Sequence, residues 1–108
     1  MTTIQQHSSC ATLINVFTVE PAKAPQLGEL LQTATEEVMR HVPGFISANI
    51  HVSTDRTRVV NYAQWASAEA YQAMLRDPTA QAHMATAAQL SERFDPHMYT
   101  VESVHEAR

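Results

Sequence analysis

The stretch that decides the fold is VVNYAQWASAEAY, which runs from Val59 to Tyr71. Its first half is rich in β-branched and aromatic residues and predicts a strand, in which alternation places Asn61 and Trp65 on the same face. Ser67 then fits the N-cap of a helix that contains Tyr71. An amide between apolar neighbours needs a hydrogen-bond partner, either within the protein or in a ligand. Asn61 is therefore the first candidate for a functional side chain.

The sequence around this stretch predicts the order strand, helix, strand, strand, helix, strand. Strands are expected at 11–19, 45–52, 59–66 and 97–104, and helices at 26–41, 68–76 and 78–93. Asp77-Pro78 separates the last two helices, with a cap followed by proline at the first helical position. This βαββαβ order is the ferredoxin-like unit, an α+β fold with a four-stranded antiparallel sheet. Residues 1–10 are expected to form a disordered lead, and residues 11–108 a single domain.

The two central strands are expected to carry the site. Right-handed crossovers place the first and third strands side by side, with the helices on one face of the sheet. Asn15 and Asn61 then share the face beneath the helices. We predict a mostly apolar pocket lined by these amides and Trp65, with Tyr71 at its helix-side wall, which is typical of a small-molecule site. Such groups suit stabilisation of an enolate or phenolate oxygen and local proton transfer.

The opposite face of the central strands is too apolar to remain in water, and a second copy of the sheet could cover it. We therefore predict a homodimer through this open face. The residues concerned are Ile14, Val16, Val60 and Tyr62.

Composition narrows the classes of function. The formal net charge of −4 and the seven scattered Lys and Arg residues disfavour a nucleic-acid partner. No segment approaches the roughly 20 apolar residues that cross a membrane. The single cysteine, Cys10, cannot form an internal disulfide, and the polar N-terminus does not resemble a signal peptide, so a cytoplasmic location is expected. The histidines have no metal-ligand spacing, and no nucleophile or phosphate-loop motif occurs.

The run Asn61-Tyr62-Ala63-Gln64-Trp65, followed by Ala70-Tyr71, resembles the antibiotic biosynthesis monooxygenase family. Val42-Pro43-Gly44-Phe45 and Ser53-Thr54-Asp55 match the same pattern, and the likeness covers roughly residues 13–90. The resemblance implies a dimeric α+β barrel of ferredoxin-like subunits. It also implies oxidation of an electron-rich aromatic polyketide (an anthrone, naphthol or hydroquinone) to a quinone by dioxygen, with no flavin, haem or metal.

The resemblance implies that Asn61, Trp65 and Tyr71 line the active site, and these are the catalytic candidates. Core packing is the alternative for Trp65, and an ordinary surface position is the alternative for Tyr71. Asn15 is a substrate-binding candidate from the burial argument alone, and an amide bonded within the core explains it equally well.

Two histidines are further substrate-binding candidates. An even-length loop at 53–58 would send His51 to the open face, and an odd loop or a bulge would send it into the pocket. The apolar pattern of its strand favours the first, whereas the resemblance favours the second. The family pattern also has an arginine in the last helix that helps to hold the substrate. No arginine lies between Arg76 and Arg93, and the matching place falls near His83, which leaves room for a different substrate.

Two other functions stay open. A haem-degrading oxygenase of the same fold would use an asparagine on the first strand and a histidine in the last helix, places that Asn15 and His83 fill. Its helix tryptophan is missing, with Met74 near that position. A non-catalytic binder of a hydrophobic metabolite would use the same pocket without turnover.

Overall fold

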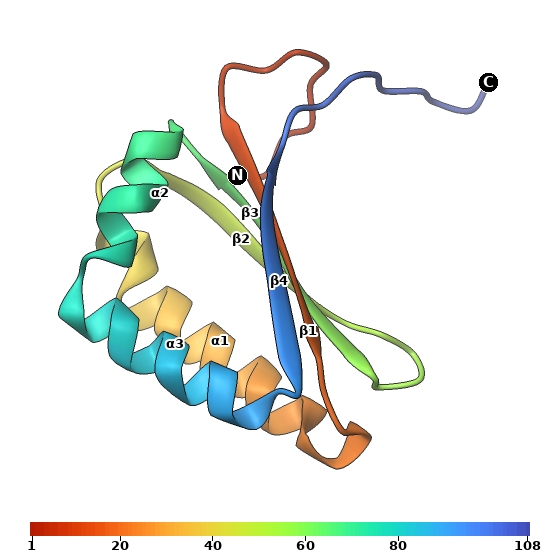
Figure 1. Ribbon diagram of the computed structural model, residues 1–108. Helices are drawn as coiled ribbons and strands as arrows, with labels where there is room; N and C mark the ends of the chain where they lie inside the picture. The colour runs from red at the N-terminus through yellow and green to blue at the C-terminus, as the bar shows by residue number, and fades with distance from the viewer.

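The computed structural model describes residues 1–108 and contains one four-stranded antiparallel sheet with helices on one face (Figure 1). The strands lie in the order β2-β3-β1-β4, so β1 and β3 are central. The predicted ferredoxin-like α+β fold is confirmed. The elements are β1 (Ala11–Thr18), η1 (Pro21–Lys23), α1 (Ala24–Glu37), η2 (Met39–His41), β2 (Phe45–Val52), β3 (Arg58–Trp65), α2 (Ala68–Leu75), α3 (Pro78–Leu90) and β4 (Arg93–Tyr99). None of the helices is long and apolar enough to cross a membrane.

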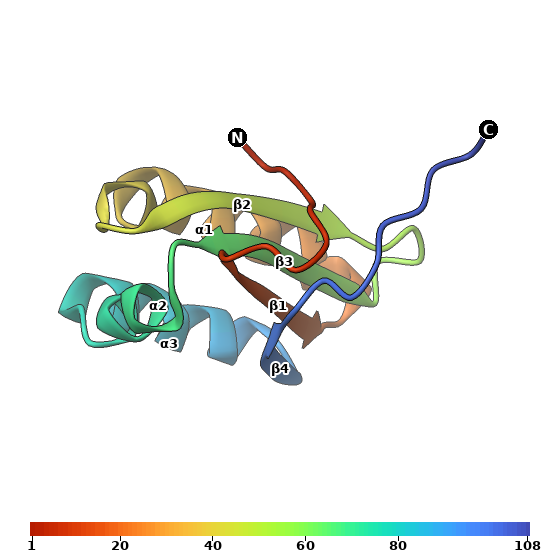
Figure 2. The same cartoon turned by 90° about the horizontal axis from the view of Figure 1, so that it is seen from above.

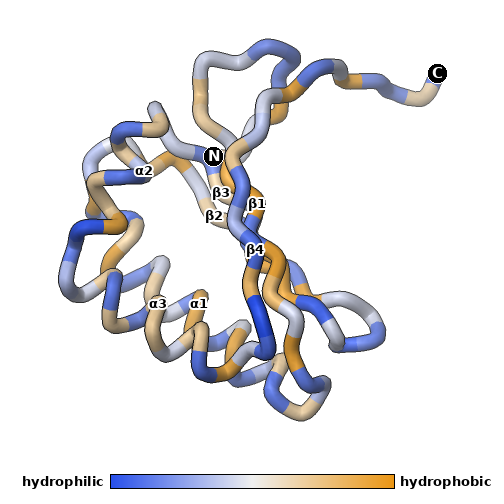
Figure 3. The backbone as a smooth tube through the Cα atoms, viewed as in Figure 1, coloured by the Kyte–Doolittle hydropathy of each residue, from blue (hydrophilic) through white to orange (hydrophobic).

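The pairing of β1 with β3 sets the two faces of the sheet. Asn15 lies opposite Asn61, so both side chains are on the face that the helices cover. Hydrophobic residues recur along α1 and β1 (Figure 3), and their buried side chains fill the space between the layers. The core consists of two clusters, one around Leu13 and Trp65 and one around Phe17 and Val59. The candidate site lies where these clusters meet.

Polar caps fix the beginnings of the two later helices. The Ser67 hydroxyl accepts a hydrogen bond from the backbone N–H of Ala70 at 3.1 Å, which starts α2 as predicted. The Asp77 carboxylate accepts from the N–H groups of Thr79 and Ala80 at 2.8 and 3.0 Å, which starts α3. These caps set the positions of the side chains that α2 and α3 direct toward the sheet.

The last strand begins earlier than the sequence predicts. Helix α3 ends at Leu90, and β4 starts at Arg93 rather than at residue 97. The prediction that Asp95-Pro96 precedes the strand was wrong, because β4 is an edge strand and tolerates the missing N–H of a proline. Pro96 lies opposite Asn15, which brings the start of β4 beside the site.

The turn between β2 and β3 fixes the register of that hairpin. Asp55 accepts hydrogen bonds from the Ser53 hydroxyl at 2.7 Å and from the Thr57 N–H at 2.9 Å and hydroxyl at 2.7 Å. These bonds lower the pKa of Asp55 from 3.8 to about 2, and the bonds from Thr57 have the largest effect. The backbone N–H of Ser53 also donates to the carbonyl of Arg58 at 2.9 Å, so the turn is held in one geometry. The resulting register is the even-length one, with Val52 opposite Val59.

The N-terminal segment crosses the open face of the sheet (Figures 1 and 2). The Gln64 side chain donates to the carbonyl of Thr3 at 2.6 Å and accepts from its N–H at 3.2 Å. Thr2 and Asn49 also exchange side-chain hydrogen bonds at 2.8 and 3.1 Å. The segment has no helix or strand, and these bonds join it to the sheet at β2 and β3.

The two glycines of the chain are expected to respond to alanine in opposite ways. Gly44 has a φ of +89°, and an added Cβ would lie 2.5 Å from the Cβ of Ala70. We expect Gly44→Ala to lower the free energy of unfolding by about 1–3 kcal/mol, because it combines backbone strain with a clash. Gly28 lies in α1, where a Cβ would meet only the Val52 side chain, at 3.8 Å. Gly28→Ala should therefore raise the free energy of unfolding by about 0.5–1 kcal/mol.

Urea denaturation of the two variants and the natural chain measures both effects. If both variants changed the free energy of unfolding equally and in the same direction, the turn at Gly44 would not constrain the approach of α2 to β2.

Candidate active site

An apolar cavity lies between the central strands and the helices. Its volume is about 100 Å³, and ten of the fourteen residues that line it are hydrophobic. The polar groups on its wall are the amides of Asn15 and Asn61, the hydroxyl of Tyr71 and the imidazole of His83. A smaller cavity of about 50 Å³ also has Asn61 in its wall and extends to Trp65. The structure thus brings five of the six predicted site residues to two neighbouring cavities.

Three buried polar atoms at this place have no hydrogen-bond partner. They are Oδ1 of Asn15, Oδ1 of Asn61 and Nε1 of Trp65. Nearly all buried polar groups in proteins are paired, and an unpaired one costs about 1–3 kcal/mol. The presence of unpaired buried groups beside a cavity is explained if a ligand supplies their partners. The alternative for Asn15 was an amide that is hydrogen-bonded within the core. The structure has no such bond, because Oδ1 of Asn15 lacks a partner.

Aromatic rings surround the smaller cavity. The Trp65 side chain is 2% exposed, and its ring centre lies 5.3 Å from that of Phe45 and 6.0 Å from that of Tyr71, both edge-on. Trp65 is therefore part of the core and also part of the cavity wall. Burial raises the pKa of the Tyr71 phenol above its ordinary value of 10.0. Tyr71 consequently keeps its proton at neutral pH and can donate a hydrogen bond.

Helix α3 contributes the opposite wall. Ala80, His83, Met84 and Ala87 recur at three- and four-residue spacing, so they share one helical face. Ala80 and Ala87 are buried and His83 is half-buried. Met84 is 37% exposed, and Phe94 on β4 is 47% exposed. Because both also line the cavity, it reaches the surface between α3 and β4.

His51 does not belong to this site. The hairpin register places it opposite Val60, so its side chain is on the open face of the sheet. The ring is exposed, and its Nδ1 lies 3.1 Å from the carbonyl oxygen of Asn49. Its assignment as a pocket residue was wrong, because the turn closed by Asp55 gives the even-length register that the apolar pattern of β2 favours.

The sequence reasoning did not predict several of the wall residues, among them Met39, Met84 and Phe94. Met39 follows α1 in a short 3₁₀ turn, and Met84 and Phe94 lie at the mouth. The signal for Met84 was its place next to His83 on the same helical face. No comparable signal existed for Phe94, because β4 was expected to begin after it.

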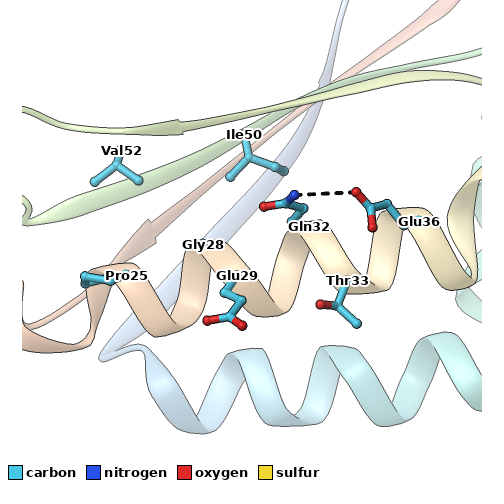
Figure 4. Close-up of a pocket in the computed structure, with 8 residues that line it drawn as sticks. All are labelled: Pro25, Gly28, Glu29, Gln32, Thr33, Glu36, Ile50 and Val52. Carbon is cyan, nitrogen blue, oxygen red and sulfur yellow. Dashed lines mark hydrogen bonds between the residues drawn. The ribbon is translucent and has the colours of Figure 1, made fainter.

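A second hollow lies between the outer side of α1 and the edge strand β2 (Figure 4). It is wide and open, with a volume of about 690 Å³, and Glu29, Gln32 and Glu36 form much of its wall. Gln32 donates to Glu36 at 3.4 Å. None of the unpartnered buried polar atoms lies there, and no group of three or more His, Cys, Asp or Glu side chains that could hold a metal ion occurs in the chain.

The sheet, its helical layer and the apolar cavity between them define the class of protein. Residues 11–86 match the family model described as antibiotic biosynthesis monooxygenase, and the chain belongs to this family. The predicted family membership is confirmed.

Three of the proteins that the chain resembles come from Streptomyces. The chain is 47% identical over 83 residues to tetracenomycin-F1 monooxygenase of Streptomyces glaucescens, covering 77% of this chain and 74% of that protein. It is similar to the ActVA-Orf6 monooxygenase of Streptomyces coelicolor, solved in complex with nanaomycin D, with 33% identity, a TM-score of 0.80 and coverage of 91% and 92% of the two chains. The fold is also that of SnoaB, a cofactor-independent oxygenase of Streptomyces nogalater, with 21% identity, a TM-score of 0.79 and coverage of 90% and 97%.

Proposed function

We propose that this protein is a monooxygenase that oxidises an electron-rich aromatic substrate, of the anthrone, naphthol or hydroquinone type, to a quinone with dioxygen. In this proposal the substrate and dioxygen carry out the redox chemistry without a flavin, haem or metal. The observation that supports it most is the pair of unpartnered amides, Asn15 and Asn61, on the wall of an apolar cavity. The names of the Streptomyces relatives support the substrate class.

The side chains suit the charge changes of this reaction. Loss of a proton from an anthrone gives a carbanion whose negative charge is shared with its carbonyl oxygen. The amide N–H groups of Asn15 and Asn61 and the protonated Tyr71 hydroxyl can stabilise that oxygen in an apolar environment. The carbanion passes one electron to dioxygen, and the two radicals combine to a peroxide anion. This anion takes back the proton that the substrate lost and becomes a hydroperoxide. Loss of water leaves the new carbonyl, so that a CH₂ group and O₂ become a C=O group and H₂O.

The shape of the cavity limits how such a substrate binds. A volume of about 100 Å³ does not hold a fused three-ring system whole, so part of it must lie in the mouth beside Met84 and Phe94. Three methionines, Met39, Met74 and Met84, form part of the wall. Methionine side chains adapt to irregular ligands because they are unbranched and flexible. This wall is therefore expected to repack when the substrate enters.

A homodimer through the open face is part of the proposal. Ile14, Val16, Val60 and Tyr62 are half-buried and share this face with the bound N-terminal segment. A second copy would remove the remaining apolar surface from water. A monomeric mass in light scattering at micromolar concentration would contradict this part of the proposal.

The test of the function is oxygen uptake by the purified protein with an anthrone, a dihydroxynaphthalene, a hydroquinone and haemin. We expect uptake with at least one of the first three, accompanied by the absorption of its quinone. Trp65 is the only tryptophan, so quenching of its fluorescence reports binding separately. Quenching without oxygen uptake would show a binding protein, and a Soret change with haemin followed by haem loss would show a haem-degrading oxygenase. Either result would overturn the proposal.

A further inference from the structure

The cavity contains few groups that can exchange a proton. The residues that line it from β1, β3, α1, η2 and β4 include no carboxylate, lysine, arginine or histidine. The two titratable side chains on its wall are Tyr71 from α2 and His83 from α3. The proposed reaction begins with removal of a proton from the substrate, so one of these two groups is the protein's available acceptor.

Tyr71 is unsuited to accept that proton. Burial disfavours its phenolate and raises its pKa above 10.0, so the hydroxyl is already protonated at neutral pH. The amides of Asn15 and Asn61 do not titrate. An imidazole, in contrast, ordinarily changes its protonation between about pH 5 and 8, which is the range in which general bases work best.

We propose that His83 is the general base of the reaction and removes the proton that starts the oxidation. This inference rests on the proposed function and adds a role to one residue of the same site. Only His51 and His97 use their rings in hydrogen bonds within the chain, so both ring nitrogens of His83 are free to meet a substrate.

The arrangement of the walls fits this role. His83 lies on the helix side of the cavity, and Asn15 and Asn61 lie on the sheet side. A substrate between the two layers can lose its proton toward α3 while negative charge develops on an oxygen that faces the amides. His83 is also half-buried rather than enclosed, so its ring can exchange the proton with water at the mouth.

The proton balance closes within one turnover. A ring nitrogen of His83 takes the proton, and the electron pair of the broken C–H bond stays on the substrate. After dioxygen has added, the imidazolium of His83 gives this proton to the peroxide anion, which becomes the hydroperoxide. The neutral imidazole then takes the second proton from the same carbon while the O–O bond breaks, which forms the carbonyl and releases hydroxide. The imidazolium of His83 protonates that hydroxide to water and returns to its neutral form.

The test compares His83→Ala and His83→Gln with His41→Ala. His41 is an exposed histidine that lines neither site cavity, so its variant serves as the matched control. We expect loss of a general base to lower kcat by about 10²- to 10⁴-fold while KM changes only a few-fold. The fall of kcat on the acid side of the pH profile should disappear in both His83 variants, and added imidazole should restore activity to His83→Ala. Circular dichroism establishes that each variant is folded.

The possible failures are distinct. Three results would show that His83 is not the base while the proposed function stands, provided that the natural chain oxidises the substrate. His83→Ala could keep the rate of the natural chain, or it could keep the fall of kcat on the acid side. It could also lose activity that added imidazole does not restore. If the natural chain shows no oxidation with any member of the substrate panel, the proposed function fails, and the role of His83 fails with it.

Discussion

Replacement of Asn61 by leucine is expected to remove most of the activity while making the protein more stable. Loss of a hydrogen-bond donor to a developing oxyanion typically lowers kcat by about 10²- to 10³-fold. Oδ1 of Asn61 is buried without a hydrogen-bond partner, so it has lost its bonds to water without replacement. Removing this atom removes that destabilisation of the folded state. The neighbouring cavity gives the larger side chain room. We therefore expect the free energy of unfolding to rise by about 1–2 kcal/mol.

Gln64 on the same strand is the matched control. Its amide is 3% exposed, donates to the Thr3 carbonyl at 2.6 Å and to the Tyr62 hydroxyl at 3.3 Å, and accepts from the N–H of Thr3 at 3.2 Å. Gln64→Leu should lower the free energy of unfolding by about 1–3 kcal/mol, because it leaves its former partners unpaired. Urea denaturation and steady-state kinetics on both variants separate a functional amide from a structural one. If Asn61→Leu is destabilised as much as Gln64→Leu, then Asn61 has a structural role.

Trp65→Ala is expected to give the largest loss of stability in the chain. The side chain is almost fully buried against Phe45 and Tyr71, and truncation of such an aromatic residue costs about 3–5 kcal/mol. Thermal and urea denaturation measure this loss. A loss below about 1 kcal/mol would show that the aromatic cluster around Trp65 contributes little to the core.

Trp65→Phe separates packing from chemistry. The substitution keeps an aromatic ring and removes Nε1–H, which has no partner within the protein. We expect its stability to stay closer to that of the natural chain than that of Trp65→Ala does. If Nε1–H binds the substrate or its oxyanion, turnover should still fall by about 10-fold or more, since one hydrogen bond of about 1.4 kcal/mol corresponds to a factor of ten. Full activity in Trp65→Phe would limit Trp65 to a packing role.

Local patterns were sufficient to predict the centre of the fold. Strand alternation and the handedness of the crossovers together place Asn15 beside Asn61, and the structure has these residues directly opposite each other. The capping residues Ser67 and Asp77 gave the starts of α2 and α3 because a short side chain satisfies a free N–H at each position. These signals are contained within a few residues of sequence.

Features that depend on contacts between distant parts of the sequence were harder to predict from it. The register that sends His51 to the open face is fixed by a network of bonds to Asp55. The apolar pattern of β2 favoured this register, whereas the family resemblance favoured the other one. The start of β4 depends on pairing with β1, which overrides the usual reading of Asp95-Pro96 as a break. The mouth at Met84 and Phe94 arises where α3 meets β4, and no local pattern records that contact. The lack of partners for Asn15 and Asn61 also becomes visible only when all neighbouring groups are in place.

The central claim is that the substrate itself reacts with dioxygen in the cavity beside Asn61. Its most direct test is the oxidation of an anthrone under ¹⁸O₂ by protein that has been dialysed against a chelator and freed of flavin. The reaction is quenched rapidly, and the quinone is analysed by mass spectrometry. We predict that the natural chain places one labelled oxygen atom in the new carbonyl, with the second appearing in water, and that Asn61→Leu does so far more slowly. A quinone without the label, or equal rates of labelling in the natural chain and Asn61→Leu, would contradict this account.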